Sequence, residues 1–160
     1  VILLSPRGRT FTQNIARELS EHDSLFLLCG HYEGIDERVV ENLVTDEISI
    51  GDFILTGGEL PAMVLIDAIC RFVPGVLGSK ESIDHDSHNQ GLLQYPQYTR
   101  PERYRGWLVP KPLLSGNHAK IERWRRTQSL IQTRERRPDL FYKQVLTETD
   151  EQLLKEGHEF

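Results

Sequence analysis

Three glycine-bearing segments, each placed after or within a short apolar run, are the parts of the chain best suited to bind a ligand. Ser5-Pro6-Arg7-Gly8 follows residues 1–4, residues 30–34 follow residues 25–29, and residues 50–58 contain three glycines. Glycine lets a ligand approach the backbone closely. If the apolar runs are parallel strands, these segments meet at the carboxyl edge of a sheet, where open α/β folds bind ligands. Together they could hold an adenosine-like molecule, whereas each alone is explained more simply as a tight turn.

The sequence lacks the motifs of several common cofactor sites. Neither G-x-G-x-x-G nor G-x-x-x-x-G-K-[ST] occurs, which argues against a Rossmann dinucleotide site and a P-loop. The 6 histidines are scattered, and Cys29 and Cys70 each stand without a C-x-x-C partner, so we expect no dedicated metal site. Because both cysteines lie in apolar runs of a chain large enough to bury a core, we expect reduced thiols in a cytoplasmic protein.

The polar run His85-Asp86-Ser87-His88 contains groups that could carry acid–base or nucleophilic chemistry. Four consecutive side chains point in different directions, so their spacing does not form a catalytic triad. The surrounding residues 79–90 have almost no apolar content and no periodicity, which favours a solvated linker. From these residues alone, either histidine or the aspartate could serve as a general base.

The net charge of −5 is distributed unevenly along the chain. Residues 1–93 carry 6 basic and 15 acidic side chains, residues 94–143 carry 12 and 4, and residues 144–160 carry 1 and 5. The middle block therefore has a net charge of +8, and its arginines are interleaved with Tyr95, Tyr98, Tyr104, Trp107 and Trp124. Such a block suits a polyanion whose phosphates contact cations and whose bases stack on rings, although a solvated helix face would explain the charge equally well.

Short apolar runs alternate with amphipathic stretches in the first half, which predicts a largely parallel sheet. We expect strands at residues 1–4, 25–29, 47–50 and 53–55, and helices at residues 11–21, from Asp36, and from Gly58 to the Pro74-Gly75 stop. Further helices are expected at residues 118–136, after Pro138, and after a cap at Thr147 or Thr149. We therefore predict an α/β domain at residues 1–78, a linker at residues 79–93 and a C-terminal helical domain at residues 94–160.

No stretch of the sequence approaches the roughly 20 uncharged apolar residues that a membrane-spanning helix needs, so we expect no membrane segment. The chain opens on Val1 rather than on Met, and its first residues lack the charged region and the cleavage site of a signal peptide. We therefore expect the chain to be part of a longer protein.

The longest motifs of the chain are Leu28-Cys-Gly-His-Tyr-Glu-Gly-Ile-Asp-Glu-Arg38 and Ser49-Ile-Gly-Asp-Phe-Ile-Leu-Thr-Gly-Gly-Glu-Leu-Pro-Ala-Met63. Shorter ones follow in order: Arg71-Phe72, Pro74-Gly-Val-Leu-Gly78, Gly91-Leu-Leu93, Tyr98-Thr-Arg-Pro101, Leu114-Ser-Gly-Asn-His118 and Trp124-Arg125. Through these motifs nearly the whole chain resembles the bacterial tRNA (guanine-N(1)-)-methyltransferases, the TrmD family of the SPOUT class. The length and order of the motifs favour a ligand site over unrelated turns at the glycine segments.

The resemblance implies a SPOUT trefoil-knot domain with a parallel sheet, lacking its N-terminal part, and a small C-terminal helical domain. It also implies a homodimer with each active site built between two subunits, and tRNA as the substrate. S-adenosylmethionine would bind in the knot. The family pattern places its binding residues at Pro6, Gly30, Tyr32, Glu33, Gly34, Ile50, Gly51, Leu55, Gly57, Gly58 and Pro61.

The resemblance implies the catalytic roles as well. The guanine N(1) carries a proton that must leave before the nitrogen can attack, and the family assigns the general base to the residue that matches Asp86. Arg71 matches the family arginine that stabilises negative charge developing on the guanine carbonyl oxygen. Further candidates are Glu33 and Ser82 for guanine, and Arg123, Arg125 and Arg126 for tRNA. Magnesium would be held loosely, because the sequence has no acidic cluster.

Two other interpretations stay open at this point. Another SPOUT enzyme, methylating ribose or a different base, would keep the cofactor pocket and would need no proton acceptor at Asp86. An inactive fragment that binds S-adenosylmethionine or RNA without turnover would fit a chain that lacks the family's N-terminal part.

Overall fold

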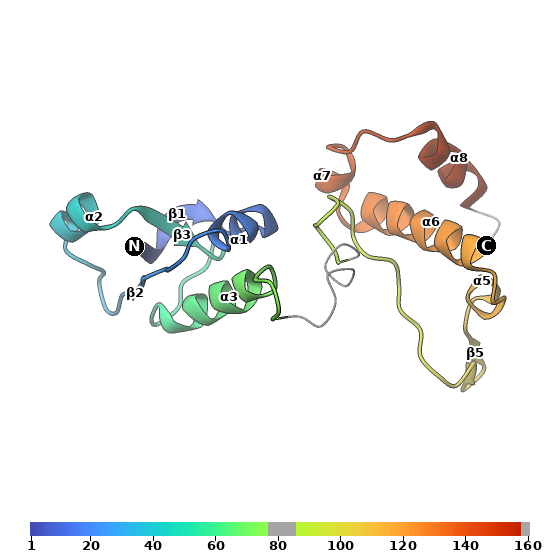
Figure 1. The fold of residues 1–160 in the computed structure, drawn as a ribbon, viewed down its shortest axis with the longest axis horizontal. Helices are drawn as coiled ribbons and strands as arrows, with labels where there is room; N and C mark the ends of the chain where they lie inside the picture. The colour runs from blue at the N-terminus through green and yellow to red at the C-terminus, as the bar shows by residue number, and fades with distance from the viewer. Residues whose placement is uncertain (77–85, 158–160) are drawn as a thin grey trace. The chain divides into compact units, whose positions relative to one another are not determined.

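The computed structural model describes residues 1–76 and 86–157. The chain divides into two compact units, Val1–Ile83 and Asp84–Phe160. Figure 1 draws the first in blue to green and the second in yellow-green to red. The first unit is a mixed α/β structure around a parallel sheet and the second is mainly helical, so the expected α/β class is confirmed.

The sheet of the first unit has three parallel strands in the order β2-β1-β3. They are β1 (Ile2–Thr10), β2 (Leu27–Cys29) and β3 (Asp46–Ser49). The first three residues of β1 pair with β2 on one side and with β3 on the other, so the central strand is apolar and buried there. This burial on both faces is typical of a parallel sheet covered by helices.

Strand β1 is longer than the sequence predicts, because it resumes after the glycine-bearing segment. Leu4 and Arg9 both lie opposite Ile48 of β3, and the intervening residues form a wide bulge. Arg9 fixes the second part of the strand by donating to Asp46 at 2.7 Å and to Glu18 at 2.9 Å. The expected turn at residues 5–8 is therefore a loop within one strand, pushed out toward the carboxyl edge of the sheet.

Within residues 1–76, the sheet is accompanied by three helices: α1 (Gln13–Leu19), α2 (Glu37–Leu43) and α3 (Glu59–Cys70). Thr12 caps α1 and Asp36 caps α2 through their side-chain oxygens. α3 lies beside α1 and buries Ala62, Leu65 and Ile69 in the core that covers the sheet (Figure 1).

The strand predicted at residues 53–55 is wrong. This segment between β3 and α3 has no strand pairing, and Phe53, Ile54 and Leu55 are exposed. These apolar residues lie at the surface of the unit, where they form part of the wall of a cavity described below, and they do not form a fourth strand.

The second unit is organised around the long helix α6 (His118–Arg136), which has the predicted bounds. It packs against α5 (Lys111–Leu114), α7 (Pro138–Phe141) and α8 (Glu148–Glu156), with Leu92, Leu130 and Leu153 at the centre of the core. Thr147 caps α8 in a capping box with Asp150, which confirms one of the two predicted caps. A two-stranded antiparallel hairpin, β4 (Arg103–Tyr104) and β5 (Trp107–Leu108), was not predicted.

Residues 86–94, of which residues 86–93 belong to the predicted linker, are held on the helical unit. The backbone N–H of Leu93 donates to the Thr133 hydroxyl of α6 at 2.9 Å, and Gln144 donates to the carbonyl of Gly91 at 3.1 Å. Residues 77–85 lie outside the described residues, so the domain boundaries at 78 and 93 stay a prediction. Across residues 1–76 and 86–157, no helix combines the length and the apolar character needed to cross a membrane.

Candidate functional site

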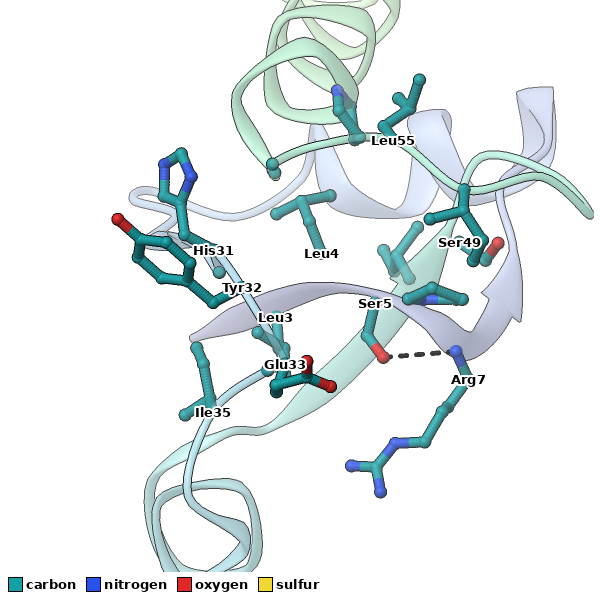
Figure 2. Close-up of a pocket in the computed structure, with 18 of the residues that line it drawn as sticks. Leu3, Leu4, Ser5, Arg7, His31, Tyr32, Glu33, Ile35, Ser49 and Leu55 are labelled. Carbon is teal, nitrogen blue, oxygen red and sulfur yellow. Dashed lines mark hydrogen bonds between the residues drawn. The ribbon is translucent and has the colours of Figure 1, made fainter.

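A cavity of about 490 Å³ opens at the carboxyl edge of the parallel sheet in the first unit. Its walls come from the bulge of β1, the turn after β2, and the segment that joins β3 to α3 (Figure 2). Ten of the eleven residues predicted to hold the cofactor line it: Pro6, Gly30, Tyr32, Glu33, Gly34, Ile50, Leu55, Gly57, Gly58 and Pro61. The three segments expected to meet at one edge of the sheet therefore do so.

All eleven predicted cofactor residues lie in the described part of the chain. Gly51 is the one among them that does not line this cavity. Its backbone N–H donates to the Ser49 hydroxyl at 3.2 Å, and that hydroxyl donates to its carbonyl at 3.1 Å. Gly51 thus shapes the turn that presents Ile50 and Phe53 to the cavity, and its own contribution is indirect.

A backbone contact joins the turn after β2 to the start of α3. The N–H of Gly58 donates to the carbonyl of Gly30 at 3.1 Å, and His31 and Gly57 form an isolated antiparallel bridge. A Cβ atom at position 58 would lie 2.7 Å from the Cα of Cys29, a distance that side chains do not reach. Glycine at position 58 therefore allows α3 to approach β2 closely enough to close this side of the cavity.

The same junction carries a contact between a histidine and a carboxylate at the rim of the cavity. The imidazole Nε2 of His31 contacts the carboxylate of Glu59, the first residue of α3. Hydrogen bonds from the Glu59 backbone N–H and from His31 lower the pKa of the Glu59 carboxyl. Burial, together with the nearby Glu59 charge, raises the pKa of the Cys29 thiol, which packs against the core of the unit and does not line the cavity.

A second set of ion pairs fixes the bulge of β1. Arg7 donates to Glu37 of α2 at 3.0 Å and to Glu47 of β3 at 3.2 Å, and these carboxylates raise the pKa of its guanidinium. The Ser5 hydroxyl accepts from the Arg7 backbone N–H at 3.2 Å, drawn as the dashed line in Figure 2. Both Arg7 and Glu37 line the cavity.

The cavity has the size and lining expected of a site for a nucleoside-sized ligand. Ligand pockets commonly measure roughly 300 to 1,000 Å³ and combine apolar walls with a few polar groups. Here Leu3, Leu4 and Ile48 supply an apolar floor, and the turns contribute backbone groups around it. In the described part of the chain, no three His, Cys, Asp or Glu side chains are grouped so that they could hold a metal ion.

The proposed catalytic residues lie on different units of the chain. Arg71 is the C-cap residue of α3 and is not part of the cavity wall. Asp86 belongs to the helical unit, where it lines a smaller cavity of about 160 Å³ together with Tyr95, Arg125 and Arg126. Ser82 lies outside the described residues.

The three arginines predicted to bind tRNA are engaged in contacts within the helical unit. Arg123 pairs with Glu156 of α8, and Arg125 donates to Glu122 at 2.7 Å while its guanidinium lies 4.8 Å from the centre of the Tyr95 ring. Arg126 donates through two nitrogens to Asp150, at 2.8 and 2.9 Å. These side chains therefore help to pack α6 against α8 and residues 94–95, in addition to any role in binding.

The sequence did not predict the contacts of Arg7 and His31 with carboxylates at the cavity. Arg7 and His31 lie inside the glycine-bearing segments, and this position alone could have indicated that they belong to the site. Their partners Glu37 and Glu59 are 30 and 28 residues away along the chain, so only the strand register and the helix start bring them together.

The chain is similar to known proteins over nearly its whole length. Residues 1–143 match the family model described as tRNA (Guanine-1)-methyltransferase TrmD. A tRNA (guanine-N(1)-)-methyltransferase of Dehalococcoides mccartyi strain 195 is 62% identical over 156 residues, covering 98% of this chain and 63% of the relative. Proteins of the same name from Staphylococcus epidermidis strain RP62A and Lachnospira eligens are each 58% identical, covering 97% and 94% of the chain. The matched part covers 63% of the Staphylococcus epidermidis protein and 64% of the Lachnospira eligens protein. The chain therefore spans less than two thirds of the length of these relatives.

Proposed function

The chain belongs to the tRNA (guanine-1)-methyltransferase family, and from this membership we propose that it transfers a methyl group from S-adenosylmethionine to N(1) of the guanine 3′ to the anticodon in tRNA. The product would be 1-methylguanosine. The observation that carries the proposal is the cavity at the carboxyl edge of the sheet, lined by ten of the eleven residues at which the family pattern places the methyl donor.

The donor would be held by the three glycine-bearing segments of the first unit, within a trefoil knot. Gly30, Ile50 and Gly57 offer backbone groups to an adenine ring, and Leu4 and Leu55 offer apolar walls. When bound, S-adenosylmethionine supplies an electrophilic methyl group on a positively charged sulfur, which leaves as a neutral thioether. The chain's own task is therefore to orient the guanine and to move one proton.

Asp86 would take the proton from N(1) of guanine. An aspartate is a weak base at neutral pH, so it would act through placement and partial desolvation, and residues 86–94 are held on α6 and on Gln144 by the hydrogen bonds described above. Arg71 would stabilise the negative charge that develops on the guanine carbonyl oxygen. Glu33, in the cavity wall, and Ser82 would contact the guanine. A magnesium ion, where it takes part, would be held loosely.

We further propose a homodimer formed through α3. Leu60, Met63 and Val64 follow helical spacing and are all exposed, although α3 also buries an apolar face on its other side. An exposed apolar face of this kind marks an association surface. In the proposed dimer, the linker and helical unit of one subunit would help to enclose guanine at the cofactor of the other. The site of action would be the cytoplasm, where tRNA is found.

The substitution Asp86→Asn tests the proposed reaction, since it keeps the size of the side chain and removes its basicity. We expect methyl transfer from labelled S-adenosylmethionine to tRNA to fall by about 10³-fold, within the range of general-base contributions. The affinities for S-adenosylmethionine and for tRNA, measured by calorimetry, should stay within about twofold of the parent.

Asp23→Asn, at an exposed turn before β2, is the matched control and should leave all three quantities unchanged. Near-normal methylation by Asp86→Asn would refute the assignment of the base. Nucleoside analysis of the product identifies the target atom: a methylated ribose or a different methylated base would indicate another SPOUT activity.

A further inference from the structure

The hairpin formed by β4 and β5 presents two aromatic side chains at the surface of the helical unit. Tyr104 and Trp107 are directly opposite each other in the antiparallel pairing, which places them on the same face of the ribbon. Their side chains are 54% and 69% exposed. In Figure 1 the hairpin, labelled β5, lies beside α5 at the end of the unit remote from α7. Large aromatic side chains exposed to this extent are available to an external partner.

The hairpin holds these rings in a defined arrangement. The two ring centroids lie 6.1 Å apart with an interplanar angle of 49°. Arg105 and Gly106 form a two-residue loop with φ values of 49° and 91°, and positive φ at both positions is the pattern of a type I′ turn. The Arg105 guanidinium lies 5.4 Å from the centre of the Tyr104 ring. One face of the tip thus combines two ring surfaces with a cation.

The charge of the hairpin is available to an external ligand. Three of the five arginines of α6, at positions 123, 125 and 126, are paired with carboxylates of the helical unit. In contrast, neither Arg103 nor Arg105 makes an ion pair within residues 1–76 and 86–157. The block at residues 94–143, with its net charge of +8, therefore places uncommitted cations next to exposed rings at this tip.

We propose that the β4–β5 hairpin binds single-stranded RNA, with a base stacked on Trp107 and backbone phosphates against Arg105 and Arg103. Aromatic side chains stack on any base, and arginines between them neutralise the phosphates. The hairpin is a binding surface and takes no part in methyl transfer. The inference rests on the proposed tRNA substrate and adds a contact to it that the family pattern does not assign.

The test measures the affinity of the chain for a labelled single-stranded RNA by fluorescence anisotropy. Trp107→Ala should weaken binding about tenfold, equivalent to about 1.4 kcal/mol. Arg105→Gln should lower the slope of log affinity against log salt by about 0.7, as expected for one lost phosphate contact to a single strand. Tyr142→Ala, which removes an exposed tyrosine of the same unit outside the hairpin, is the matched control and should bind like the parent. Equal melting temperatures of all variants would show that folding is unchanged.

The intrinsic tryptophan fluorescence gives a direct second readout. The chain has two tryptophans, and Trp124 is 3% exposed while Trp107 is 69% exposed, so RNA should quench and acrylamide should reach mainly Trp107. Quenching by RNA should vanish in Trp107→Phe. Parent-like RNA affinity of Trp107→Ala would overturn the proposal. Shielding of Trp107 from acrylamide at rising protein concentration without RNA would also overturn it, in favour of a protein partner.

The outcomes separate this inference from the proposed reaction. RNA binding that depends on Trp107, in a chain whose product is not 1-methylguanosine, would contradict the proposed function and support the hairpin. Formation of 1-methylguanosine by a chain whose RNA affinity does not depend on Trp107 would support the proposed function and contradict the RNA-binding role of the hairpin.

Discussion

At the scale of single residues, the cavity depends on the absence of a side chain at position 58. Gly58 accepts a helical backbone conformation, with φ of −83°, that any residue could adopt. What excludes other residues is the 2.7 Å separation between a Cβ at this position and the Cα of Cys29. This glycine therefore positions α3 against β2, and its role in a ligand site follows from that packing.

The substitution Gly58→Ala should push α3 away from β2 and open one wall of the cavity. Overpacking against backbone atoms typically costs about 1 to 3 kcal/mol. We expect a lower melting temperature and an S-adenosylmethionine affinity reduced at least about tenfold, measured by differential scanning calorimetry and titration calorimetry.

Gly30→Ala is the control for this prediction, because Gly30 lies at the other end of the same hydrogen bond. A Cβ there would meet the Ile35 side chain at 3.5 Å, an ordinary contact, so the melting temperature should change little. Equal melting temperatures for Gly58→Ala and Gly30→Ala would contradict the packing explanation.

At the scale of helices and strands, the sequence predicts best those elements whose signals are local. Helix α6 has its predicted bounds because Asn117 caps its first turn and Trp124 and Leu130 mark its buried face. The glycine-bearing segments also converge as expected, since parallel strands place their carboxyl ends on one edge. Residues 53–55 are apolar like a strand, but without a pairing partner they form part of a cavity wall and an exposed surface instead.

The remaining elements depend on contacts that a single sequence does not reveal. The second half of β1 is a strand because Arg9 and Thr10 pair with Ile48 and Ser49 of β3, about 39 residues away, and Arg9 also donates to Glu18 and Asp46. The β4–β5 hairpin turns on Arg105-Gly106, and arginine is uncommon at a position with positive φ. Its usable signal is a glycine in a two-residue gap between Tyr104 and Trp107.

The docking of α8 on α6 depends on one nearly buried carboxylate. The side chain of Asp150 is 5% exposed, accepts from Arg126 and from the Thr147 backbone N–H, and has its pKa lowered from 3.8 to about 2, chiefly by the Arg126 hydrogen bonds. Because the pKa is lower in the folded state, the carboxylate stabilises the fold above pH 4 and loses this contribution as the pH falls toward 2.

Asp150→Asn should therefore lower the free energy of unfolding and remove the part of its pH dependence that comes from this carboxylate. We expect the free energy of unfolding at pH 7 to fall by about 2 kcal/mol, and the gap between parent and variant to narrow between pH 4 and pH 2. Urea unfolding followed by the emission of buried Trp124, in a Trp107→Phe background, measures both quantities. Asp139→Asn removes a comparable but exposed pair with Arg137 and should have no measurable effect. A gap that stays constant from pH 7 to pH 2 would contradict the role of Asp150.

The contact between Arg126 and Asp150 also affects how the RNA affinity of variants that lack an arginine of α6 is interpreted. Removing Arg126 would leave the Asp150 carboxylate nearly buried without its partner, which destabilises the packing of α8. A lower RNA affinity of an Arg126 variant could then follow from unfolding of the helical unit. The cations of the hairpin, which make no such pair in the described chain, report on RNA binding more directly.

At the scale of the whole molecule, the groups proposed for the reaction are divided between two folding units. The cavity and Arg71 belong to the α/β unit, whereas Asp86 and the basic hairpin belong to the helical unit. Each unit has its own core, so a substitution in one core should disturb that unit first. Because of this division, we expect substitutions in the α/β unit to change the affinity for the proposed methyl donor and substitutions in the hairpin to change the affinity for RNA.

The proposed homodimer can be tested by a substitution on the exposed apolar face of α3. Met63 is 65% exposed at the centre of the apolar face of α3, with Leu60 and Val64 on either side along the helix. Met63→Asp would bury an unpaired charge in the proposed interface, so we expect the dissociation constant of the dimer to rise at least about 100-fold. Sedimentation velocity over a range of protein concentrations measures it, and Val145→Asp, at an exposed position of the helical unit, is the control that should leave the dimer intact. The methyl-donor affinity of monomeric Met63→Asp then shows whether one subunit suffices for cofactor binding. A Met63→Asp protein that sediments like the parent would place the interface away from this face of α3.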